Sequence, residues 1–450
     1  MQQDQPSLSR EDLIAALAAG EKPREQWRIG TEHEKFVFHR DTLAPAPFDG
    51  QRGIERLLDR LIGFGWEPKR EAGRIIALYR REGASITLEP GGQLELSGAP
   101  LRSLHETCRE INGHLHQIRA VGDELDFGYL GLGFHPLARL DAIPPVPKAR
   151  YRIMRAYMPK KGNHGLDMMF RTTTVQVNLD FADERDMVRK MRVAMALQPL
   201  ATALFANSPF VEGRPCGYLS YRSFVWMDTD PDRTGILPFV FEDGFGYERY
   251  VDWVLDAPMY FVERDGIFHD VAGASFRDFL AGRLPQLPGL RATMKDWDDH
   301  LTTVFPEVRL KTFLEMRGAD GGPWAQLCAL PAFWVGLLYD DAALAAAEAL
   351  VRDWSAADIL ALRQQVPTSA LATPFQGRSV RDWLQDVLAI ARDGLKARAL
   401  CNEKGEDETS FLDTLDEIVT EGRTLAEQLL AAYETRWGRD VRPVFREQAY

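Results

Sequence analysis

Four glutamates on two short segments are the residues of this sequence best suited to chemistry. The segments are residues 28–38 and 86–98, and both alternate β-branched, aromatic or aliphatic residues with polar ones, which predicts strands. Residues two apart on a strand share a face, so the first two acids project together with Phe36. The four acids are Glu32, Glu34, Glu89 and Glu95.

The second segment contains a turn sequence, Pro90-Gly91-Gly92, which predicts a hairpin. With a three-residue loop, Glu89 pairs with Gln93, and Thr87 pairs with Glu95. Several carboxylates on one β-face repel each other unless cations compensate them, so the set predicts a divalent metal site with oxygen ligands. The opposite face is then filled by Ile86, Leu88, Leu94 and Leu96.

Residues 308–317 alternate in the same way and are predicted to form one strand, with Glu315 and Arg317 on the same face. An acid and a base side by side suit a site where a metal ion and a phosphoryl group meet. The same two residues would also make a structural ion pair, and the alternation does not separate the two alternatives.

The cleanest alternation lies in residues 171–181, which predicts a strand of a central sheet. One face is apolar, and we expect the polar face to line a cleft. The polar face carries Thr172, Thr174, Gln176, Asn178 and Asp180.

Basic residues offer candidates for binding anions. Lys160 and Lys161 begin a glycine-containing loop, which is either a phosphate-binding loop or a solvated turn. Arg222, in an aromatic stretch, is a candidate for bidentate recognition of a carboxylate, with an ordinary ion pair as the alternative. Arg150 belongs to a group of arginines too closely spaced to be assigned individually from the pattern.

The composition is that of an ordinary globular protein with a large core, because 45% of the 450 residues are hydrophobic and 27% are charged. The net charge of −12 argues against general binding to nucleic acid or anionic membranes. The apolar run 331–339 is too short to span a bilayer, and the first residues lack an apolar signal-peptide core. We therefore expect a soluble, cytoplasmic protein.

The four cysteines are scattered along the chain without a CxxC pair, so neither a zinc site nor a dense disulfide framework is expected. Buried thiols are the simplest expectation, and a regulatory disulfide stays open. The cysteines are Cys108, Cys216, Cys328 and Cys401.

Helical patterns separate and follow the predicted strands, which predicts an α+β fold around a largely antiparallel sheet. The first helix has a cap at Ser9, a capping-box acid at Asp12 and a stop at Gly20. Residues 208–300 are expected to be rich in loops. The predicted helices cover residues 7–20, 52–63, 101–123, 184–206 and most of the chain beyond about 323.

Familiar nucleotide and protease motifs are absent. There is no GxxxxGK[ST] loop, no strand-linked GxGxxG and no nucleophile elbow. His33-Glu34 begins like a zinc-protease motif, but Val37 stands where a second histidine is needed. Carboxylates on strands, polar strand faces and arginines therefore remain as the chemical candidates.

At these residues the sequence resembles the glutamate–cysteine ligases of the plant and proteobacterial type. The resemblance includes Ile29-Gly30-Thr31-Glu32-His33-Glu34-Lys35-Phe36 and extends in order over about residues 28 to 340. The other matching segments are residues 86–98, 165–172, 174–181, 206–210, 226–235, 258–261, 300–310 and 315–324.

The resemblance implies one catalytic domain over residues 1–450, with a glutamine-synthetase-like core at 28–340 and a helical region at 341–450. It also implies the cofactors ATP and Mg²⁺ and the substrates L-glutamate and L-cysteine, in a monomer or homodimer. ATP would phosphorylate the side-chain carboxylate of glutamate, and the cysteine amine would then displace phosphate. This reaction is the first step of glutathione synthesis.

Roles for individual residues follow from the same resemblance. Arg317 would neutralise the transferred phosphoryl group, with Glu315 beside it as a catalytic residue. Arg150 and Arg222 would hold glutamate, and Tyr260 would lie at the cysteine subsite. The substrate-facing strand would contribute Thr174, Gln176 and Asn178, and the metal ligands would be Glu32, Glu34, Glu89, Glu95 and Glu315.

Three alternatives stay open. The first is an ATP-dependent carboxylate–amine ligase for a different amine. The second is a metal-dependent hydrolase that uses the same carboxylates without ATP. The third is a nucleotide-binding protein without catalysis, which the number of carboxylates disfavours.

Overall fold

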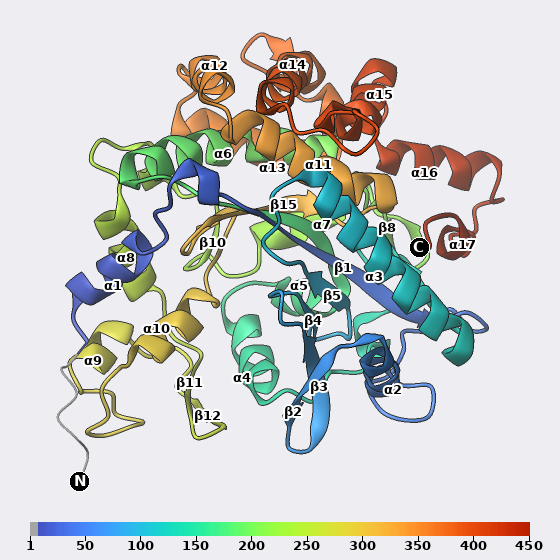
Figure 1. The fold of residues 1–450 in the computed structure, drawn as a ribbon. Coiled ribbons are helices and arrows are strands. Elements are labelled where there is room, and N and C mark those ends of the chain that lie inside the picture. Colours follow the sequence, from blue (N-terminus) through green and yellow to red (C-terminus); the bar gives the residue numbers. More distant parts are fainter. Residues whose placement is uncertain (1–7) are drawn as a thin grey trace.

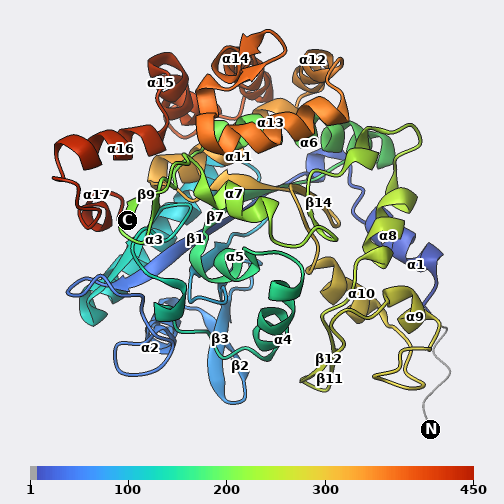
Figure 2. The same cartoon turned by 180° about the vertical axis from the view of Figure 1, so that it is seen from behind.

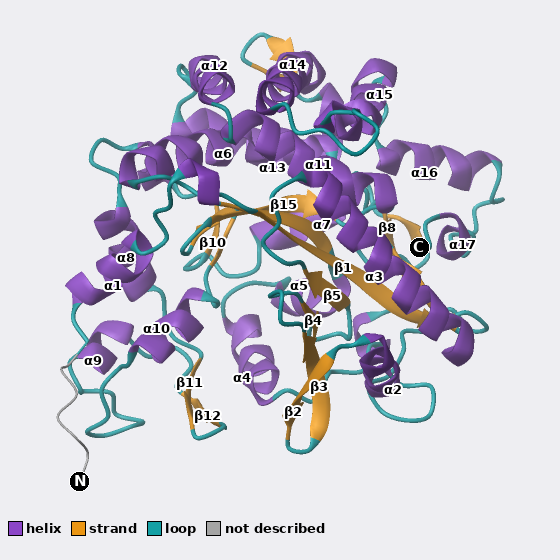
Figure 3. Ribbon diagram, in the orientation of Figure 1, coloured by secondary structure: helices purple, strands orange, loops and turns teal. Residues whose placement is uncertain are grey.

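An antiparallel sheet runs through the centre of the protein (Figures 1 and 3). The computed structural model describes residues 8–450, and nine strands in this part form the sheet in the order β14-β15-β7-β1-β5-β4-β3-β2, with β6 also paired to β1. The predicted fold class is confirmed. The strands are β1 (Ile29–His39), β2 (Glu67–Glu71), β3 (Arg74–Tyr79), β4 (Ser85–Leu88), β5 (Leu94–Ser97), β6 (Phe127–Leu130), β7 (Thr174–Leu179), β14 (Val308–Leu310) and β15 (Leu314–Asp320).

The β4–β5 hairpin has the predicted register. Thr87 lies opposite Glu95, and the backbone N–H of Glu89 donates to the carbonyl of Gln93 at 3.0 Å. Gly92 has φ +81°, a conformation that glycine adopts without steric cost. The aliphatic side chains of both strands are buried, so the other face of the hairpin is left for its polar residues.

The single strand predicted over 308–317 is wrong, because the chain reverses between β14 and β15. Lys311 donates its backbone N–H to the carbonyl of Phe313, and Arg309 lies directly opposite Glu315. The turn occupies three residues, so odd-numbered residues keep the same face on both strands. Alternation therefore continues through the turn, and the pattern could not reveal it.

Helices cover one face of the sheet and leave the other face open for the polar residues. The covering helices α3 (Leu104–Leu125) and α11 (Trp324–Leu338) pack on β1, and α6 (Glu184–Leu204) packs on β15, as Figure 1 shows. The helices predicted at 52–63, 101–123 and 184–206 are confirmed, the first as α2 (Ile54–Leu61).

The first helix, α1 (Arg10–Ala18), is also confirmed. Its N-cap is Ser9, whose hydroxyl accepts from the backbone of Asp12 while the Asp12 carboxylate accepts from the backbone of Ser9. The first predicted residue, Ser7, lies outside the described residues.

Residues 208–300 contain more regular structure than predicted. Their helices are short, so they lack the sustained 3.6-residue period that identifies a helix in sequence. Figure 2 shows α7 beside the sheet, where it contacts β15 and α13 (Ala356–Ser369). The elements in this part are α7 (Tyr221–Met227), α8 (Tyr247–Asp256), α9 (Phe276–Leu280), α10 (Met294–Leu301) and the hairpin β11 (Phe261–Arg264) and β12 (Ile267–Asp270).

The chain after residue 323 is mainly helical, as predicted, with one short pair of strands at 374–379. In residues 8–450 no single helix is both long and apolar enough to cross a membrane; only α11 and α12, bent by 89° at their junction, meet the length and composition criteria together. The remaining helices are α4 (Ala149–Tyr157), α5 (Gly165–Arg171), α12 (Asp341–Val351), α14 (Val380–Arg398), α15 (Asp413–Glu421), α16 (Leu425–Thr435) and α17 (Val444–Glu447).

The expectation of four buried thiols is wrong. Cys108 in α3 and Cys328 in α11 form a disulfide with their Cα atoms 5.7 Å apart, while Cys216 is half-buried and Cys401 is exposed. The pair is 220 residues apart in sequence and meets because α3 and α11 pack side by side.

Candidate active site

A cavity of about 290 Å³ lies against the open face of the sheet. All four glutamates predicted to share a site line it, and they come from β1, from β5 and from the end of β4. Arg150, Gln176 and Arg317 line it too. The structure therefore gathers residues that are up to 285 positions apart in the chain (Glu32 to Arg317). We call Glu32, Glu34, Glu89 and Glu95 the acidic set.

Neutral groups, not cations, contact the acidic set. Asn178 donates to Glu32 Oε1 at 2.9 Å, and the backbone N–H of Thr174 donates to Glu34 Oε2 at 3.1 Å. Glu95, which lies opposite Glu34 in the β1–β5 pairing, accepts from two hydroxyls of the same hairpin. Within residues 8–450 none of the four carboxylates forms an ion pair. Their negative charge is left for a ligand to compensate.

The pKa values of two of these acids are displaced by the arrangement. Burial, followed by the charges of Glu315 and Glu95, raises the pKa of Glu32 to about 7. Burial and the charges of Glu89 and Glu95 raise the pKa of Glu34 well above its usual range. The protein thus holds carboxylates in a position where ionisation is unfavourable without a cation.

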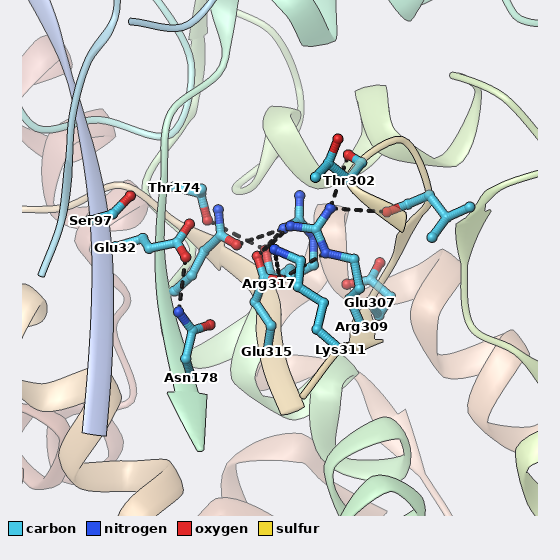
Figure 4. Close-up of polar contacts among 12 residues, drawn as sticks. Glu32, Ser97, Thr174, Asn178, Thr302, Glu307, Arg309, Lys311, Glu315 and Arg317 are labelled. Atoms are coloured by element: carbon cyan, nitrogen blue, oxygen red, sulfur yellow. Dashed lines mark hydrogen bonds and ion pairs between the residues drawn. The ribbon is translucent and has the colours of Figure 1, made fainter. Parts of the chain in front are cut away.

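The opposite end of the cavity is organised around Glu315 (Figure 4). This side chain is fully buried, and Arg309 donates to its two oxygens at 2.7 and 2.8 Å. Lys311 lies 3.5 Å away, and Arg317 pairs with the same carboxylate. We call Arg309, Lys311 and Arg317 the basic set. Burial opposes ionisation of Glu315, but the basic set holds its pKa well below the usual range.

Glu315 is predicted to be a metal ligand, but in the structure the basic set surrounds its carboxylate. Both of its oxygens already accept from protein cations, which favours the ion-pair alternative left open by the sequence. Its contact with three cations makes it the anchor of the basic set.

A bulge in β15 directs Arg317 into the cavity. The pairing of β15 with β7 shifts register between Met316 and Ala319, and the backbone N–H of Arg317 instead donates to the carbonyl of Glu307. The guanidinium then donates to Gln176 Oε1 at 2.8 Å. A Cβ on Gly318 would lie 2.6 Å from side-chain oxygens of Gln198 and Glu307, so a larger residue at the bulge would displace the ends of these side chains.

Two of the residues predicted to face substrate hold the acidic set instead. Asn178 contacts Glu32, and Thr174 contacts Glu34, whereas Gln176 lies at the cavity itself. Arg150 lines the cavity and lies over the ring of Tyr151 at 5.0 Å.

Other predicted residues lie elsewhere. Arg222 lines a second, smaller cavity that also borders Arg317. Tyr260 is 1% exposed and does not line either cavity, although the next residue, Phe261, lines the main one. Its hydroxyl is 3.4 Å from Asp230, and Arg233 covers its ring.

Lys160 and Lys161 are not brought to either cavity. Lys160 is exposed, and Lys161 forms an ion pair with Asp232 at 2.5 Å. This placement favours the solvated turn, the second of the two alternatives for this loop.

Several cavity residues were not predicted. Arg309 and Lys311 alternate with Glu315 in the run 308–317, so their shared face was detectable, but their proximity depends on the turn. The others come from segments without a clear period. They include Thr302, Thr303, Phe305 and Phe261.

The carboxylates of the acidic set fit Mg²⁺ when other ligands complete the coordination of the ion. In the described part of the chain, no three acids, cysteines or histidines converge closely enough to ligate one ion. Mg²⁺ is usually held by one or two carboxylates together with phosphates and water, so the acidic set fits this ion when a phosphate ligand completes its shell. Burial and the neighbouring acids raise the pKa values of Glu32 and Glu34, and a bound cation would favour the ionised forms of both.

The open sheet face, with acids at one end of a cavity and arginines at the other, defines an enzyme that acts on charged small molecules. The chain belongs to the glutamate-cysteine ligase family 2, whose family model matches residues 28–447. This family assignment agrees with the resemblance seen in the sequence.

Plant relatives are similar to this chain over almost its whole length. The chain is 56% identical over 444 residues to glutamate–cysteine ligase B, chloroplastic, of Oryza sativa subsp. japonica, covering 98% of this chain and 88% of the relative. It is also 56% identical to the chloroplastic glutamate–cysteine ligase of Arabidopsis thaliana, covering 98% of this chain and 83% of that one.

A solved structure has the same fold at much lower identity. It is the glutamate–cysteine ligase of Francisella tularensis in complex with AMP. The TM-score is 0.55 at 13% identity, and the match covers 94% of this chain and 88% of the other.

Proposed function

We propose that the protein joins the side-chain carboxylate of L-glutamate to the amine of L-cysteine at the expense of ATP, the first step of glutathione synthesis. Its membership of the glutamate-cysteine ligase family supports this reaction. The single structural observation that carries it is the cavity in which the acidic set faces the basic set. Phosphoryl transfer to a carboxylate needs cations around the phosphates, and this cavity can assemble them from both ends.

We assign the acidic set to Mg²⁺ bound to the phosphates of ATP. Glu32 and Glu34 lie on β1, and Glu95 lies beside them on β5, so one strand pair would present several carboxylates to the same ligand. Bound there, the metal would neutralise phosphate charge. Asn178 and Thr174 keep the carboxylates oriented through their hydrogen bonds.

The basic set stabilises the charge that spreads over the transferred phosphoryl group. Glu315 holds Arg309 and Arg317 through direct contacts, so their guanidinium groups need no reorganisation during the reaction. Gln176 fixes Arg317 from a second side. Phosphorylation converts glutamate into an acyl donor with a good leaving group, and the amine of cysteine then attacks that acyl carbon. This route requires no side-chain nucleophile.

Substrate recognition is assigned to residues around the main cavity and around the second cavity, both of which border Arg317. Arg150 and Arg222 are proposed to hold the charged groups of glutamate through bidentate hydrogen bonds. The cysteine subsite is proposed at Phe261, with the buried Tyr260 behind it. The hydrogen bond from Arg222 to the carbonyl of Arg317 supports a proposal in which glutamate binds next to the transferred phosphoryl group.

A panel of amines tests the reaction. Phosphate release by the purified protein is measured with ATP, Mg²⁺, glutamate and one amine at a time, under reducing conditions. The proposal expects release with cysteine well above that with glycine, alanine or cysteamine, and formation of γ-glutamylcysteine by mass spectrometry. Faster turnover with another amine would identify a different carboxylate–amine ligase. Hydrolysis without ATP would identify the metal-dependent hydrolase.

Assembly and location complete the proposal. We propose a monomer or homodimer, and sedimentation velocity would distinguish the two. The cytoplasmic location expected from the sequence stays a prediction, since the plant relatives are named chloroplastic. Cell fractionation would test it.

A further inference from the structure

Asp320, the last residue of β15, is a buried acid that the proposed chemistry leaves unexplained. Its side chain is 1% exposed and has no ion pair among residues 8–450. It accepts instead from three donors. The backbone N–H of Asn207 and the hydroxyl of Ser208 donate to Oδ2 at 2.9 and 2.6 Å, and the hydroxyl of Ser220 donates to Oδ1 at 2.7 Å.

The two serines connect this carboxylate to the start of α7. The Ser208 hydroxyl accepts from the backbone N–H of Arg222 at 3.1 Å, and the Ser220 hydroxyl accepts from the backbone N–H of Ser223 at 3.2 Å. A serine hydroxyl has one proton, and here each proton is given to Asp320. Only lone pairs then face the first turn of the helix, so the carboxylate fixes both hydroxyls as acceptors.

Arg222 is the second residue of α7, and its side chain lies where this arrangement can control it. It is 4% exposed, and its Nη2 donates to the carbonyl of Arg317 at 2.9 Å. Its Nε is buried and has no protein partner in the part of the chain that the structure describes. The side chain makes this one hydrogen bond within residues 8–450, so most of its N–H donors stay free beside the second cavity, which is lined also by Glu307, Arg363 and Trp226.

The Asp320 side chain packs directly against the backbone of Gly133. A Cβ on Gly133 would lie 2.4 Å from the Asp320 Cγ, so the side chain has no room to move toward this segment. Gly133 itself donates its backbone N–H to the carbonyl of Asn207, the residue whose own N–H binds the carboxylate. The carboxylate thus has a closed environment on one side and the start of α7 on the other.

We propose that Asp320 is a positioning residue: through Ser208 and Ser220 it fixes the first turn of α7 and so aims the Arg222 guanidinium at a carboxylate group of glutamate. The inference rests on the proposed role of Arg222 in binding glutamate. It adds a residue that contacts no substrate and acts through hydroxyl orientation. Burial lowers the pKa of Arg222 and the charge of Asp320 opposes this effect, so the carboxylate also helps to keep the guanidinium charged.

The test compares steady-state kinetics of Asp320→Asn with those of Ser208→Ala, which removes one of the two bridging hydroxyls. Glutamate binds Arg222 before and during the reaction, so loss of its alignment should raise the KM for glutamate about 10-fold or more while kcat changes little. The KM for ATP should stay within about twofold. Ser208→Ala keeps the test informative if Asp320→Asn does not fold.

Glu408→Gln is the matched control. Glu408 is also fully buried, and it accepts the backbone N–H of Leu104 at the start of α3 at 2.6 Å. It lines neither cavity. This variant should lower the melting temperature as Asp320→Asn does, but leave the KM for glutamate unchanged. An equal rise of that KM in the control would show a general loss of stability and overturn the inference.

Arg222→Met separates the inference from the function on which it rests. If this variant raises the KM for glutamate and neither Asp320→Asn nor Ser208→Ala does, the positioning role is wrong and the proposed recognition by Arg222 stands. If Arg222→Met leaves that KM unchanged, the role of Arg222 itself is wrong, and the inference fails with it.

Discussion

The acidic set and the basic set occupy one cavity, but the protein treats their charges in opposite ways. Three carboxylates of the acidic set, Glu32, Glu34 and Glu95, accept from neutral donors, and the pKa values of Glu32 and Glu34 are raised. The basic set surrounds Glu315, whose pKa is held low. At the compensated end, formed by Glu315 and the basic set, the carboxylate is paired without a ligand and the three cations leave a net positive charge. At the uncompensated end, formed by the acidic set, the carboxylates are paired only when a cation binds.

The difference separates two tasks. Arginines that stabilise a transition state must be in place before the reaction, because reorientation during the reaction would cost part of the stabilisation. Carboxylates that receive a metal with its nucleotide must instead bind and release it in every turnover. The compensated end around Glu315 matches the first task, and the uncompensated end with the acidic set matches the second.

The largest expected effect comes from removing the anchor of the compensated end. Glu315→Gln leaves Arg309, Lys311 and Arg317 without their shared carboxylate, so the three cations repel each other and lose their alignment. We expect ADP formation to slow by at least ~10²-fold, since electrostatic preorganisation at one such group is worth several kcal/mol. Single-turnover kinetics at saturating Mg²⁺ measure it. If the variant turns over at nearly the wild-type rate, Glu315 has no catalytic role.

The uncompensated end predicts a dependence of stability on pH and metal. The pKa of Glu32 is about 7 in the folded protein against an ordinary value of 4.5, so the folded state binds this proton more tightly than the unfolded state. The stabilisation is present at low pH and lost as the pH rises through about 7. Unfolding by denaturant in EDTA should therefore show a larger loss of stability from about pH 5 to about pH 8 in the wild type than in Glu32→Gln.

Mg²⁺ supplies the control for the same experiment. Above about pH 7 Glu32 is ionised, so addition of Mg·ATP should stabilise the wild type more at about pH 8 than at about pH 6. The gain should be smaller in Glu32→Gln. If the stability of the wild type and that of Glu32→Gln change equally with pH, both with and without Mg·ATP, the assignment of Glu32 to the uncompensated end is wrong.

A smaller effect should come from the residue that joins the two ends. Gln176 lies opposite Glu32 in the β1–β7 pairing and accepts from Arg317 at 2.8 Å. Gln176→Met keeps the volume but removes this charge-assisted hydrogen bond, which is worth about 1.5–3 kcal/mol. We expect kcat to fall by about 10-fold, less than in Glu315→Gln because Glu315 still holds Arg317. A larger loss of kcat in Gln176→Met than in Glu315→Gln would show that Gln176 contributes more than Glu315 to the alignment of Arg317.

The smallest effect is expected outside both ends. Lys160 is exposed and lines neither cavity, so Lys160→Ala should change the KM for ATP by less than about twofold. An increase well beyond that value would restore the phosphate-binding role that the sequence left open. Circular dichroism would serve to verify that the variant is folded.

The sequence predicted the parts of the site that depend on local geometry. The alternation in residues 28–38 placed Glu32 and Glu34 on one strand face, and the turn at Pro90–Gly92 placed Glu89 and Glu95 on one face of the hairpin. The pairing of β1 with β5, which brings Glu34 opposite Glu95, is a long-range contact. The strand at 171–181 was also recognised, but two of its polar residues hold carboxylates instead of facing the cavity. Their roles depend on β7 lying between β1 and β15, which no local pattern specifies.

Long-range packing explains the errors. Tyr260 and Phe261 are adjacent, and only the way β11 packs decides that the second of them reaches the cavity. The disulfide between Cys108 and Cys328 likewise depends on α3 and α11 covering the same sheet face.

By itself, the sequence determined the strands at 28–38 and 171–181, the hairpin register and the membership of the acidic set, because side-chain alternation follows directly from backbone geometry. Matching segments gave the resemblance to a ligase family. Only the tertiary structure decided which cations neutralise Glu315, which acids stay uncompensated, and how Asp320 is connected to Arg222. Those choices depend on distances between segments far apart in the chain, and folding fixes such distances through the burial of whole faces of the sheet and its helices.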